Sequence, residues 1–411
     1  MSTLRRTKEN MQEEAHQPLK GLRVIDFSSM MAGPYCGRWL ADMGADVIKI
    51  ESPEGDYMRG RPPMHGAESS YFGHLNSGKR SIVLDLKNSD AVRVARALAK
   101  GADVLIEGFR PGVMQRLGLD YPTLLPECPH LIYCSVSGWG QDGPRAQQAA
   151  YASIVHAAVG FDMAWQAGQQ GDGTPPNCVV QIADVIAASF AAMGIQAALI
   201  GRQSSGKGQY VDLALAEGML ALMPLEIMQA QFPSPATRTS YHPISASDAY
   251  FITTPLTQKN FTDLCVAIGR PQMLSDARFA TSPERVRHWS EFMGEISDWA
   301  AGHTAAECVE TLEAAGLPAS LYGTVTSALS DPQLEARGFF RSVEDSTGQY
   351  RVAGLPFTLD GQQWAQQPAA RIPRLGQHTY EVLRDVLGYG EDVIQEISGN
   401  GAFGAAGRLP A

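Results

Sequence analysis

The sequence has few cysteines, and no two of them form a close pair. No spacing among them fits a zinc site or a disulfide framework. We therefore expect no bound metal, and reduced thiols of a cytoplasmic protein are the simplest interpretation. The six residues are Cys36, Cys128, Cys134, Cys178, Cys265 and Cys308.

An excess of basic residues is also missing. The chain has 411 residues with 33 Lys and Arg against 43 Asp and Glu, a formal net charge of -10. This balance disfavours a general nucleic-acid binder, although a local basic site could still bind phosphate. With 44% hydrophobic residues, the length is enough for two or three globular domains.

The first 18 residues contain no apolar stretch. MSTLRRTKENMQEEAHQP is polar and of mixed charge, so we predict a flexible arm over residues 1–18 rather than a signal peptide. The apolar segment after Asp184 is slightly short for a membrane span and contains Ser189 and Gln196. A protein interior suits it better, and we expect no membrane partner.

The glycine motif of dinucleotide-binding enzymes is absent as well. Gly21 to Glu51 predicts a strand at Arg23–Phe27, a helix at about 34–43 and a strand at Asp46–Ile50. This is the βαβ opening of a doubly wound α/β fold. Gly33 and Gly37 do not form G-x-G-x-x-G, which disfavours a nicotinamide-dependent oxidoreductase.

Changes of pattern along the chain predict its domains. Strands and helices alternate over residues 19–233, which predicts a large domain with a parallel sheet. Residues 234–247 are rich in Pro, Ser and Thr and are predicted to be a linker. A strand followed by several helices over 248–328 indicates a smaller α+β domain. Residues 329–411 predict a helix, a hairpin with its turn at Ser346–Gly348, and a helical tail.

One segment is almost free of charge. Between Asp172 and Arg202, Asp184 is the only charged residue. After it, Ile186, Phe190, Met193, Ala197 and Ile200 have the spacing of one helical face. Alanines fill the other faces of the same helix. This predicts a buried helix with Asp184 in its first turn.

Two interpretations of Asp184 follow from this position. Asp is a common N-cap residue, so a structural cap is one of them. A catalytic carboxylate is the other, because charged side chains are rarely buried unless something satisfies or uses them. The two are compatible, since a helix N-terminus favours the ionised form that a nucleophilic carboxylate requires.

A short basic turn precedes a predicted strand in NSGKRSIVLDLK, residues 76–87. Gly78, Lys79 and Arg80 could bind a phosphate through backbone amides and cationic side chains. A solvated turn is the commoner interpretation of so short a basic cluster.

Taken together and in order, several strings resemble the family III CoA-transferases, the group that contains formyl-CoA transferase and carnitine CoA-transferase. They are GLRVIDFSSMMAGP, GADVIKIESP, NSGKRSIVLDLK, ADVLIEGFRPGVMQRLGLDY, LIYCSVSGWGQDGP, SGKGQYVDLALAE and LGQHTYEVL. The resemblance implies a Rossmann-like large domain, completed by residues 329–411, and a smaller domain. It also implies that each chain forms a ring and that two rings interlink in a homodimer.

In this resemblance Asp184 falls at the position of the family's catalytic aspartate. The implied reaction moves CoA from an acyl-CoA to a carboxylic acid through an aspartyl anhydride and an aspartyl-CoA thioester. Covalent catalysis of this kind divides one difficult exchange into easier steps. CoA and acyl-CoA are then substrates, and no tightly bound cofactor is expected.

Two other activities remain as alternatives. Racemases of the same family move an α-proton with a His–Asp pair, and the His would fall at Tyr151 here. His156 is near in sequence, but five residues further along a helix it would point to a different face. The second alternative is a CoA-ester-binding subunit without turnover, against which the intact Asp184 argues.

The resemblance also suggests where CoA binds. The suggested contacts are Met31, Ala32 and Ser52 after the first two strands, Leu84 to Lys87, Phe109, Arg110 and Arg116, together with Tyr151. Arg116 would be a phosphate ligand and Phe109 an apolar wall. For any one of these residues, ordinary packing or surface exposure is an equal alternative.

Three positions depart from formyl-CoA transferase. That enzyme has Gln where Met31 stands, Lys where Ala149 stands and an acidic residue where Ala152 stands. It also has a run of glycines in the small domain, and none occurs here between Ser234 and Tyr250. We therefore do not expect formate or oxalate as preferred substrates, and apolar Met31 and Ala149 would suit a larger or less charged acyl group.

Overall fold

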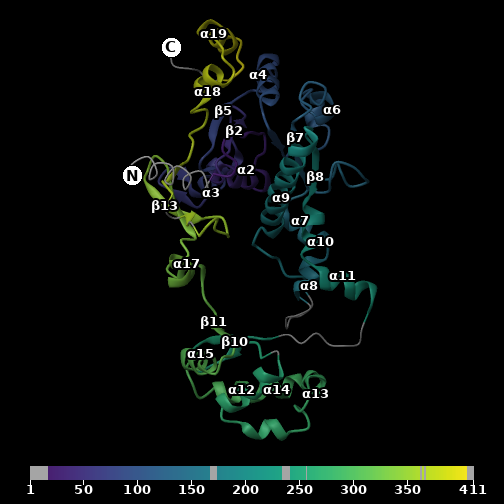
Figure 1. Ribbon diagram of the computed structural model, residues 1–411, viewed down its shortest axis with the longest axis vertical. Helices are drawn as coiled ribbons and strands as arrows, with labels where there is room; N and C mark the ends of the chain where they lie inside the picture. The colour runs from purple at the N-terminus through teal and green to yellow at the C-terminus, as the bar shows by residue number, and fades with distance from the viewer. Residues whose placement is uncertain are drawn as a thin grey trace. The chain divides into compact units, whose positions relative to one another are not determined.

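The computed structural model describes residues 17–166, 174–233, 241–255, 257–361, 363–364 and 367–404. The chain divides into two compact units (Figure 1). The larger contains Met1–Ile227 and Gln333–Ala411, and the smaller contains Met228–Pro332. The predicted arm lies almost wholly in residues 1–16, outside the described part.

A parallel sheet forms the centre of the larger unit. Within the described residues its strands are β1 (Arg23–Asp26), β2 (Asp46–Glu51), β5 (Arg80–Val83), β6 (Val104–Glu107), β7 (Ile132–Ser137) and β8 (Tyr210–Ala214). Their order is β5-β2-β1-β6-β7-β8, and every neighbouring pair is parallel. The α/β prediction is confirmed. The strand order reverses between β1 and β6, the place where ligands bind in open α/β sheets.

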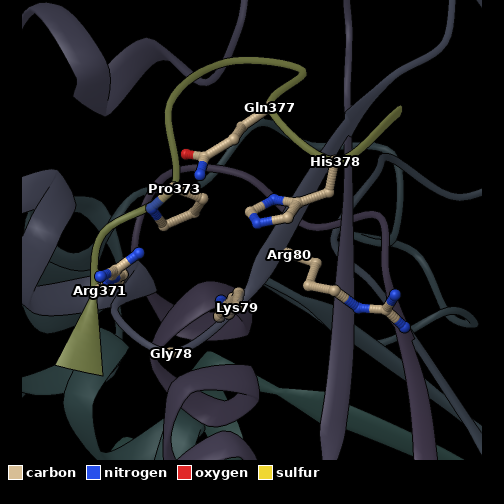
Figure 2. A pocket seen from close by; sticks show the side chains of 7 residues that line it. All are labelled: Gly78, Lys79, Arg80, Arg371, Pro373, Gln377 and His378. Atoms are coloured by element: carbon tan, nitrogen blue, oxygen red, sulfur yellow. The ribbon is translucent and has the colours of Figure 1, made fainter. Parts of the chain in front are cut away.

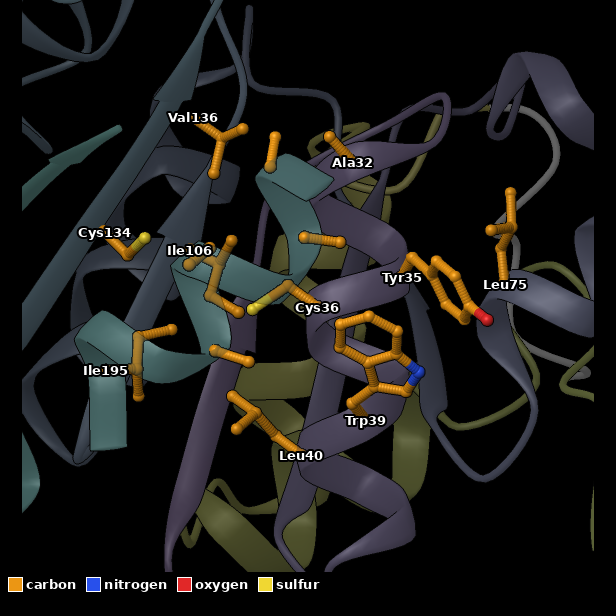
Figure 3. Packing of buried hydrophobic residues seen from close by; sticks show 14 of the residues in the cluster. Ala32, Tyr35, Cys36, Trp39, Leu40, Leu75, Ile106, Cys134, Val136 and Ile195 are labelled. Atoms are coloured by element: carbon orange, nitrogen blue, oxygen red, sulfur yellow. The ribbon is translucent and has the colours of Figure 1, made fainter. Parts of the chain in front are cut away.

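Alternate residues of each strand supply two cores, one on each face of the sheet. Val24 packs with α2 (Ala32–Asp42) and α9 (Ile182–Ser205), whereas Ile25 packs with α4 (Ser89–Lys100). Figure 3 shows the first core, where α2 and α9 pack side by side over the strands that carry Ile106 and Cys134. Side chains alternate along a strand, so a sheet covered on both faces needs apolar residues at every position.

The buried face of helix α9 is its alanine face, and large apolar side chains lie on its exposed face. Ala187, Ala188 and Ala191 are fully buried, whereas Met193 is 59% exposed and Ile200 is 68% exposed. Small side chains allow α2 to approach closely, so the alanine face turns inward. Among the described helices, only α9 is long and apolar enough to span a membrane, a test that core helices of soluble proteins also pass.

The segment after the smaller unit returns to the larger one. It forms α17 (Pro332–Ala336) and then the hairpin β12 (Phe340–Glu344) and β13 (Gln349–Ala353), with the turn as predicted. Arg341 of β12 forms an ion pair with Asp42, which also pairs with buried Arg38. β14 (Ala370–Arg371) pairs with β12. Figure 1 shows the yellow helices α18 (Thr379–Glu381) and α19 (Glu391–Gly399) near β5 and α4.

The smaller unit has its own core. An antiparallel sheet of β9 (Ile244–Ser245), β10 (Tyr250–Thr253) and β11 (Ala319–Leu321) packs with α12 (Gln258–Ala267), α14 (Trp289–Ala300) and α15 (Ala305–Ala314). The strand β9 lies within the predicted linker, because buried Ile244 belongs to this core. Residues 234–240 of that linker lie outside the described part.

Shorter elements connect these parts. Those in the larger unit include η1 (Tyr57–Gly60), β3 (Met64–His65), β4 (Glu68–Ser69), α3 (Ser70–Asn76), α5 (Val113–Arg116), α6 (Tyr121–Leu124), α7 (Ala152–Ala158), α8 (Phe161–Gln166), α10 (Leu215–Ala221) and the π-helix η4 (Val382–Val386). Helix α11 (Pro224–Gln231) leads into the smaller unit, which also contains η2 (Pro271–Ser275), α13 (Ser282–Arg287) and α16 (Val325–Ala328).

Candidate active site

Asp184 is the third residue of α9, in its first turn as predicted. The N-cap interpretation is wrong, because Gln181 occupies that position and its side chain makes no capping hydrogen bond. The first turn is held from another helix. Nε2 of buried His156, on α7, accepts a hydrogen bond of 3.1 Å from the backbone N–H of Ala183. An imidazole thus satisfies one of the free amides at the start of α9.

Asp184 is largely removed from solvent and has no charged partner among the described residues. Burial raises the pKa of this carboxyl to about 6, and no other cause contributes. The ionised form was expected to be favoured by the helix N-terminus, but desolvation outweighs that effect. The carboxylate is therefore mostly ionised at neutral pH, yet poorly solvated. A carboxylate in this state is a better nucleophile than one surrounded by water.

Tyr71 of α3 lies near Asp184, and the sequence analysis did not select it. Burial raises the pKa of the Tyr71 phenol first, and the negative charge of Asp184 raises it further. Its hydroxyl lies 2.8 Å from the sulfur of Met31, the residue just before α2. Met31 and Tyr71 therefore lie side by side near the candidate nucleophile. A neutral phenol is a hydrogen-bond donor. Apart from its nearness to the basic turn, nothing in the sequence indicates that Tyr71 belongs to the site.

Several predicted CoA contacts share one edge of the sheet. Ser52 follows β2, Leu84 follows β5 and Phe109 follows β6 by two residues, so all lie at carboxyl ends of parallel strands. The loop at Phe109 is fixed by its backbone N–H, which donates to the Glu107 carboxylate at 2.9 Å. Burial raises the pKa of Glu107 to about 7. This edge, beside the reversal point at β1 and β6, is the one expected to bind a nucleotide.

The predicted contacts differ in exposure. Those exposed to solvent are Ser52, Lys87, Arg110, Arg116 and Tyr151. Leu84 and Ala32 are buried, so they could contact a ligand only through the backbone, and Phe109 is half-buried against the core. In the described part of the chain, no group of three or more His, Cys, Asp and Glu could hold a metal ion.

Tyr151 and His156 lie on different faces of the same helical segment, as predicted. Tyr151, the N-cap of α7, is 64% exposed, whereas His156 is 1% exposed. The Nε2 atom of His156 is already occupied by the Ala183 N–H, and burial lowers the pKa of the ring. This imidazole is therefore not placed to exchange a proton with a substrate.

The Lys79 side chain of the basic turn is neither available to bind phosphate nor exposed to solvent. The Lys79 ammonium is buried and donates to Asp26 Oδ2 at 2.8 Å, to the Pro34 carbonyl at 2.7 Å and to Asn76 Oδ1 at 2.9 Å. These three bonds use all its donors. A Cβ at Gly37 would lie 3.1 Å from Lys79 Nζ, so the glycine makes room for this ion pair.

Comparison with known proteins agrees with this geometry. The family model described as CoA-transferase family III matches residues 19–379. The chain is 33% identical over 386 residues to the succinate–glutarate CoA-transferase of Agrobacterium fabrum, covering 90% of this chain and 96% of the relative. It is 34% identical over 402 residues to the succinyl-CoA–D-citramalate CoA-transferase of Chloroflexus aurantiacus, covering 92% and 96%.

Other relatives differ in substrate but share the reaction class. The acetyl-CoA:oxalate CoA-transferase of Acetobacter aceti is 35% identical over 356 residues, covering 84% of this chain and 90% of the relative. A crystal structure of a CaiB/BaiF family protein from Brucella suis has a TM-score of 0.78 at 30% identity, covering 90% of this chain and 100% of that one. The chain therefore belongs to CoA-transferase family III and is an enzyme.

Proposed function

We propose that the protein moves CoA from an acyl-CoA to a carboxylic acid, with Asp184 as the nucleophile. The observation that carries this proposal is the position of Asp184. It is a lone carboxylate in the first turn of a helix, and burial raises its pKa to about 6. The transferase names of the relatives support the same reaction class.

The reaction proceeds in balanced steps. An Asp184 oxygen attacks the thioester carbonyl carbon, the C–S bond breaks, and CoA leaves as a thiolate beside a mixed anhydride. The thiolate then attacks Cγ of Asp184, which forms an aspartyl-CoA thioester and releases the first acid as a carboxylate. The acceptor carboxylate attacks the same carbon and expels the thiolate. The thiolate finally attacks the acceptor's carbonyl carbon and frees Asp184. No net proton is consumed.

Water must be kept from the two activated intermediates. The buried alanines of α9 and the residues of α2 belong to one hydrophobic core, part of which Figure 3 shows. The phenol of Tyr71, which donates to the Met31 sulfur in the free protein, lies near enough to feel the charge of the carboxylate, and we propose that it turns to donate to an oxygen of the tetrahedral intermediates. A dry site with one donor favours transfer over hydrolysis.

Dicarboxylic acids are the proposed substrate class. Several relatives are named for succinyl-CoA or succinate together with glutarate, citramalate or mesaconate. We propose succinyl-CoA as the first donor to test. Apolar Met31 beside the nucleophile does not favour a small charged acid such as oxalate, although one relative is named for oxalate. Succinyl-CoA is therefore best tested beside acetyl-CoA and formyl-CoA, with glutarate and oxalate as competing acceptors.

We also propose a cytoplasmic homodimer of interlinked rings. All six cysteines have free thiols, which suits a reducing compartment. An apolar stripe on the outer side of α9 suits a subunit contact: exposed Val185, Met193 and Ile200 recur at intervals of about two helical turns. Charged residues are absent from this stripe between Asp184 and Arg202.

Mass spectrometry after incubation with the donor panel and a hydroxylamine quench tests the reaction. We expect an adduct on the peptide that contains Asp184 with one donor, and none in the Asp184→Ala protein. An unmodified Asp184 with every donor, accompanied by exchange of an α-proton into deuterated water, would overturn the transferase proposal in favour of a racemase. Retained CoA binding without either signal would indicate a binding subunit.

A further inference from the structure

A pocket outside the candidate active site brings together side chains that carry hydrogen-bond donors. It lies between the turn at Gly78–Arg80 and the return segment from Arg371 to His378, and has a volume of about 300 Å³. All of these residues belong to the larger unit. Figure 2 shows the Arg371 guanidinium, the Gln377 amide and the His378 ring around one space, with the Arg80 side chain extending away from it.

Backbone amides already occupy the acceptor atoms of two lining side chains. Gln377 Oε1 accepts from the N–H of Arg374 at 2.9 Å, which leaves its Nε2 donors for the pocket. His378 Nδ1 accepts from the N–H of Ser81 at 3.1 Å. Burial lowers the pKa of this ring, so it is neutral and its proton is on Nε2. Both side chains therefore present donors to the pocket.

The nearby carbonyl oxygens are occupied too. The Arg371 carbonyl accepts from the N–H of Gly78 at 2.8 Å, and the Pro373 carbonyl accepts twice from Arg59 at 3.1 Å. Each of these bonds also fixes the backbone that forms the wall. The polar side chains of the pocket therefore offer mainly donors, and a ligand that pairs with them would have to supply acceptors.

The charge of the lining has one sign. No Asp or Glu lines the pocket. Of the acids near it, Glu381 is paired with Arg80 at 3.1 Å, Arg80 also holds Asp46, and Glu344 stands opposite Arg371 in the pairing of β12 with β14. The Arg371 guanidinium is exposed and makes no ion pair within the described residues. It is a free cation beside two neutral donors.

We propose that this pocket binds a small oxyanion, a carboxylate or a phosphate, on Arg371, Gln377 and His378. An oxyanion has only acceptors, which matches the donors of these three side chains, and a guanidinium binds it in a bidentate manner. The volume is large enough for a dicarboxylate or a phosphate ester.

The site is separate from Asp184. Gly78 and Lys79 precede β5 and Arg80 is its first residue, so they lie at the amino edge of the sheet. Asp184 is in the first turn of α9, and near the other end of this helix Arg202 pairs with Asp103, which precedes β6, at 2.9 Å. Helix α9 therefore runs from the carboxyl edge to the amino edge, and Asp184 lies at the edge opposite the pocket. An anion bound here would not take part in the chemistry at Asp184.

Calorimetric titration of the full-length protein with succinate and with inorganic phosphate tests the proposal. The Asp184→Ala background prevents turnover. Arg371→Gln should weaken binding at least about tenfold, since a charge-assisted bond is lost. Gln377→Glu keeps an oxygen for the Arg374 N–H but places a negative charge in the pocket, so it should abolish binding. Arg374→Gln, an exposed arginine outside the lining, is the matched control and should bind as the parent does.

The comparison of anions identifies the ligand class. Binding of succinate alone or of phosphate alone, lost in Arg371→Gln, names a carboxylate or a phosphate ligand respectively. Equal affinity of the parent and Arg371→Gln for both anions would overturn the proposal, as would a loss in Arg374→Gln as large as that in Arg371→Gln. Melting temperatures of the variants establish that each is folded.

Discussion

At the scale of single residues, the proposed role of Asp184 as nucleophile implies an acid limit on activity. Burial raises its pKa to about 6, and only the carboxylate can attack a thioester. We predict that kcat/KM falls about tenfold for each unit of pH below 6. Near neutral pH, where Asp184 is ionised, this group should cause no further change in kcat/KM. Initial rates with saturating acceptor, measured between about pH 4.5 and 8, check this. A profile without a decline until pH 4 would contradict the burial of Asp184.

The same burial has a cost in stability. The carboxyl has a pKa near 6 in the folded protein against 3.8 ordinarily, so the folded state binds its proton more tightly. Folding stability therefore falls as pH rises through this window, and the full loss, about 3 kcal/mol, is present above pH 6. We predict that Asp184→Asn abolishes activity yet stabilises the protein at pH 7.5 by up to about 3 kcal/mol, with little gain near pH 4.

Denaturant unfolding of Asp184→Asn at both pH values measures this effect. Exposed Asp298 of α14 provides the control, because Asp298→Asn changes the same chemical group without burial. A gain of equal size at both pH values, or a loss at pH 7.5, would show that desolvation of Asp184 is not the source of the cost.

At this scale the sequence could single out a residue only where it is isolated. Asp184 was selected because no other charge lies near it in the chain, and its catalytic role stays a prediction. Lys79 was misread because its partner, Asp26, lies 53 residues away and only the sheet brings them together. Tyr71 was missed for the same reason, since its relation to Asp184 exists only after α3 and α9 are placed.

At the scale of elements, the start of α9 depends on α7. His156 supplies the only side-chain acceptor that the structure gives to the first-turn amide of Ala183. Its removal leaves a buried N–H unpaired, which costs about 1–3 kcal/mol, and frees the turn that carries Asp184. We predict that His156→Leu lowers kcat by about tenfold or more, since small displacements of a reacting group are costly.

His156→Gln is the conservative comparison. Its amide oxygen can accept from Ala183, so this variant should recover most of the kcat lost in His156→Leu, with KM for acyl-CoA similar in both. Steady-state kinetics and melting temperatures of the pair separate positioning from general stability. Equal kcat in the two variants would show that the hydrogen bond to Ala183 does not position Asp184.

The helix α9 also shows what periodicity can and cannot predict. Its spacing predicted a helix and the place of Asp184 in the first turn, and both are confirmed. The same spacing could not say which face is buried, because large apolar side chains and alanines both suit an interior. Contact with α2 decided it: Ala187 and Ala191 allow close packing, and Met193 is left outside.

At the scale of the whole molecule, the exposed apolar stripe of α9 is expected to pack against another subunit. Val185, Met193 and Ile200 are exposed on one side of a helix with no intervening charge, a pattern typical of an interface rather than of a solvated surface. We predict that the protein is a dimer by light scattering and that dilution to nanomolar concentration gives no monomer, because interlinked rings cannot separate without unfolding.

Charge in this stripe should prevent assembly. The double substitution Met193→Glu and Ile200→Glu places two carboxylates where a partner is expected, and desolvating unpaired charges is costly. We predict monomers or insoluble protein on expression, whereas Lys207→Glu, an exposed change in the turn after α9, leaves the dimer intact. A doubly substituted protein that remains a dimer would move the interface away from α9. A parent protein that dilutes into monomers would exclude interlinked rings, because their separation requires one chain to open.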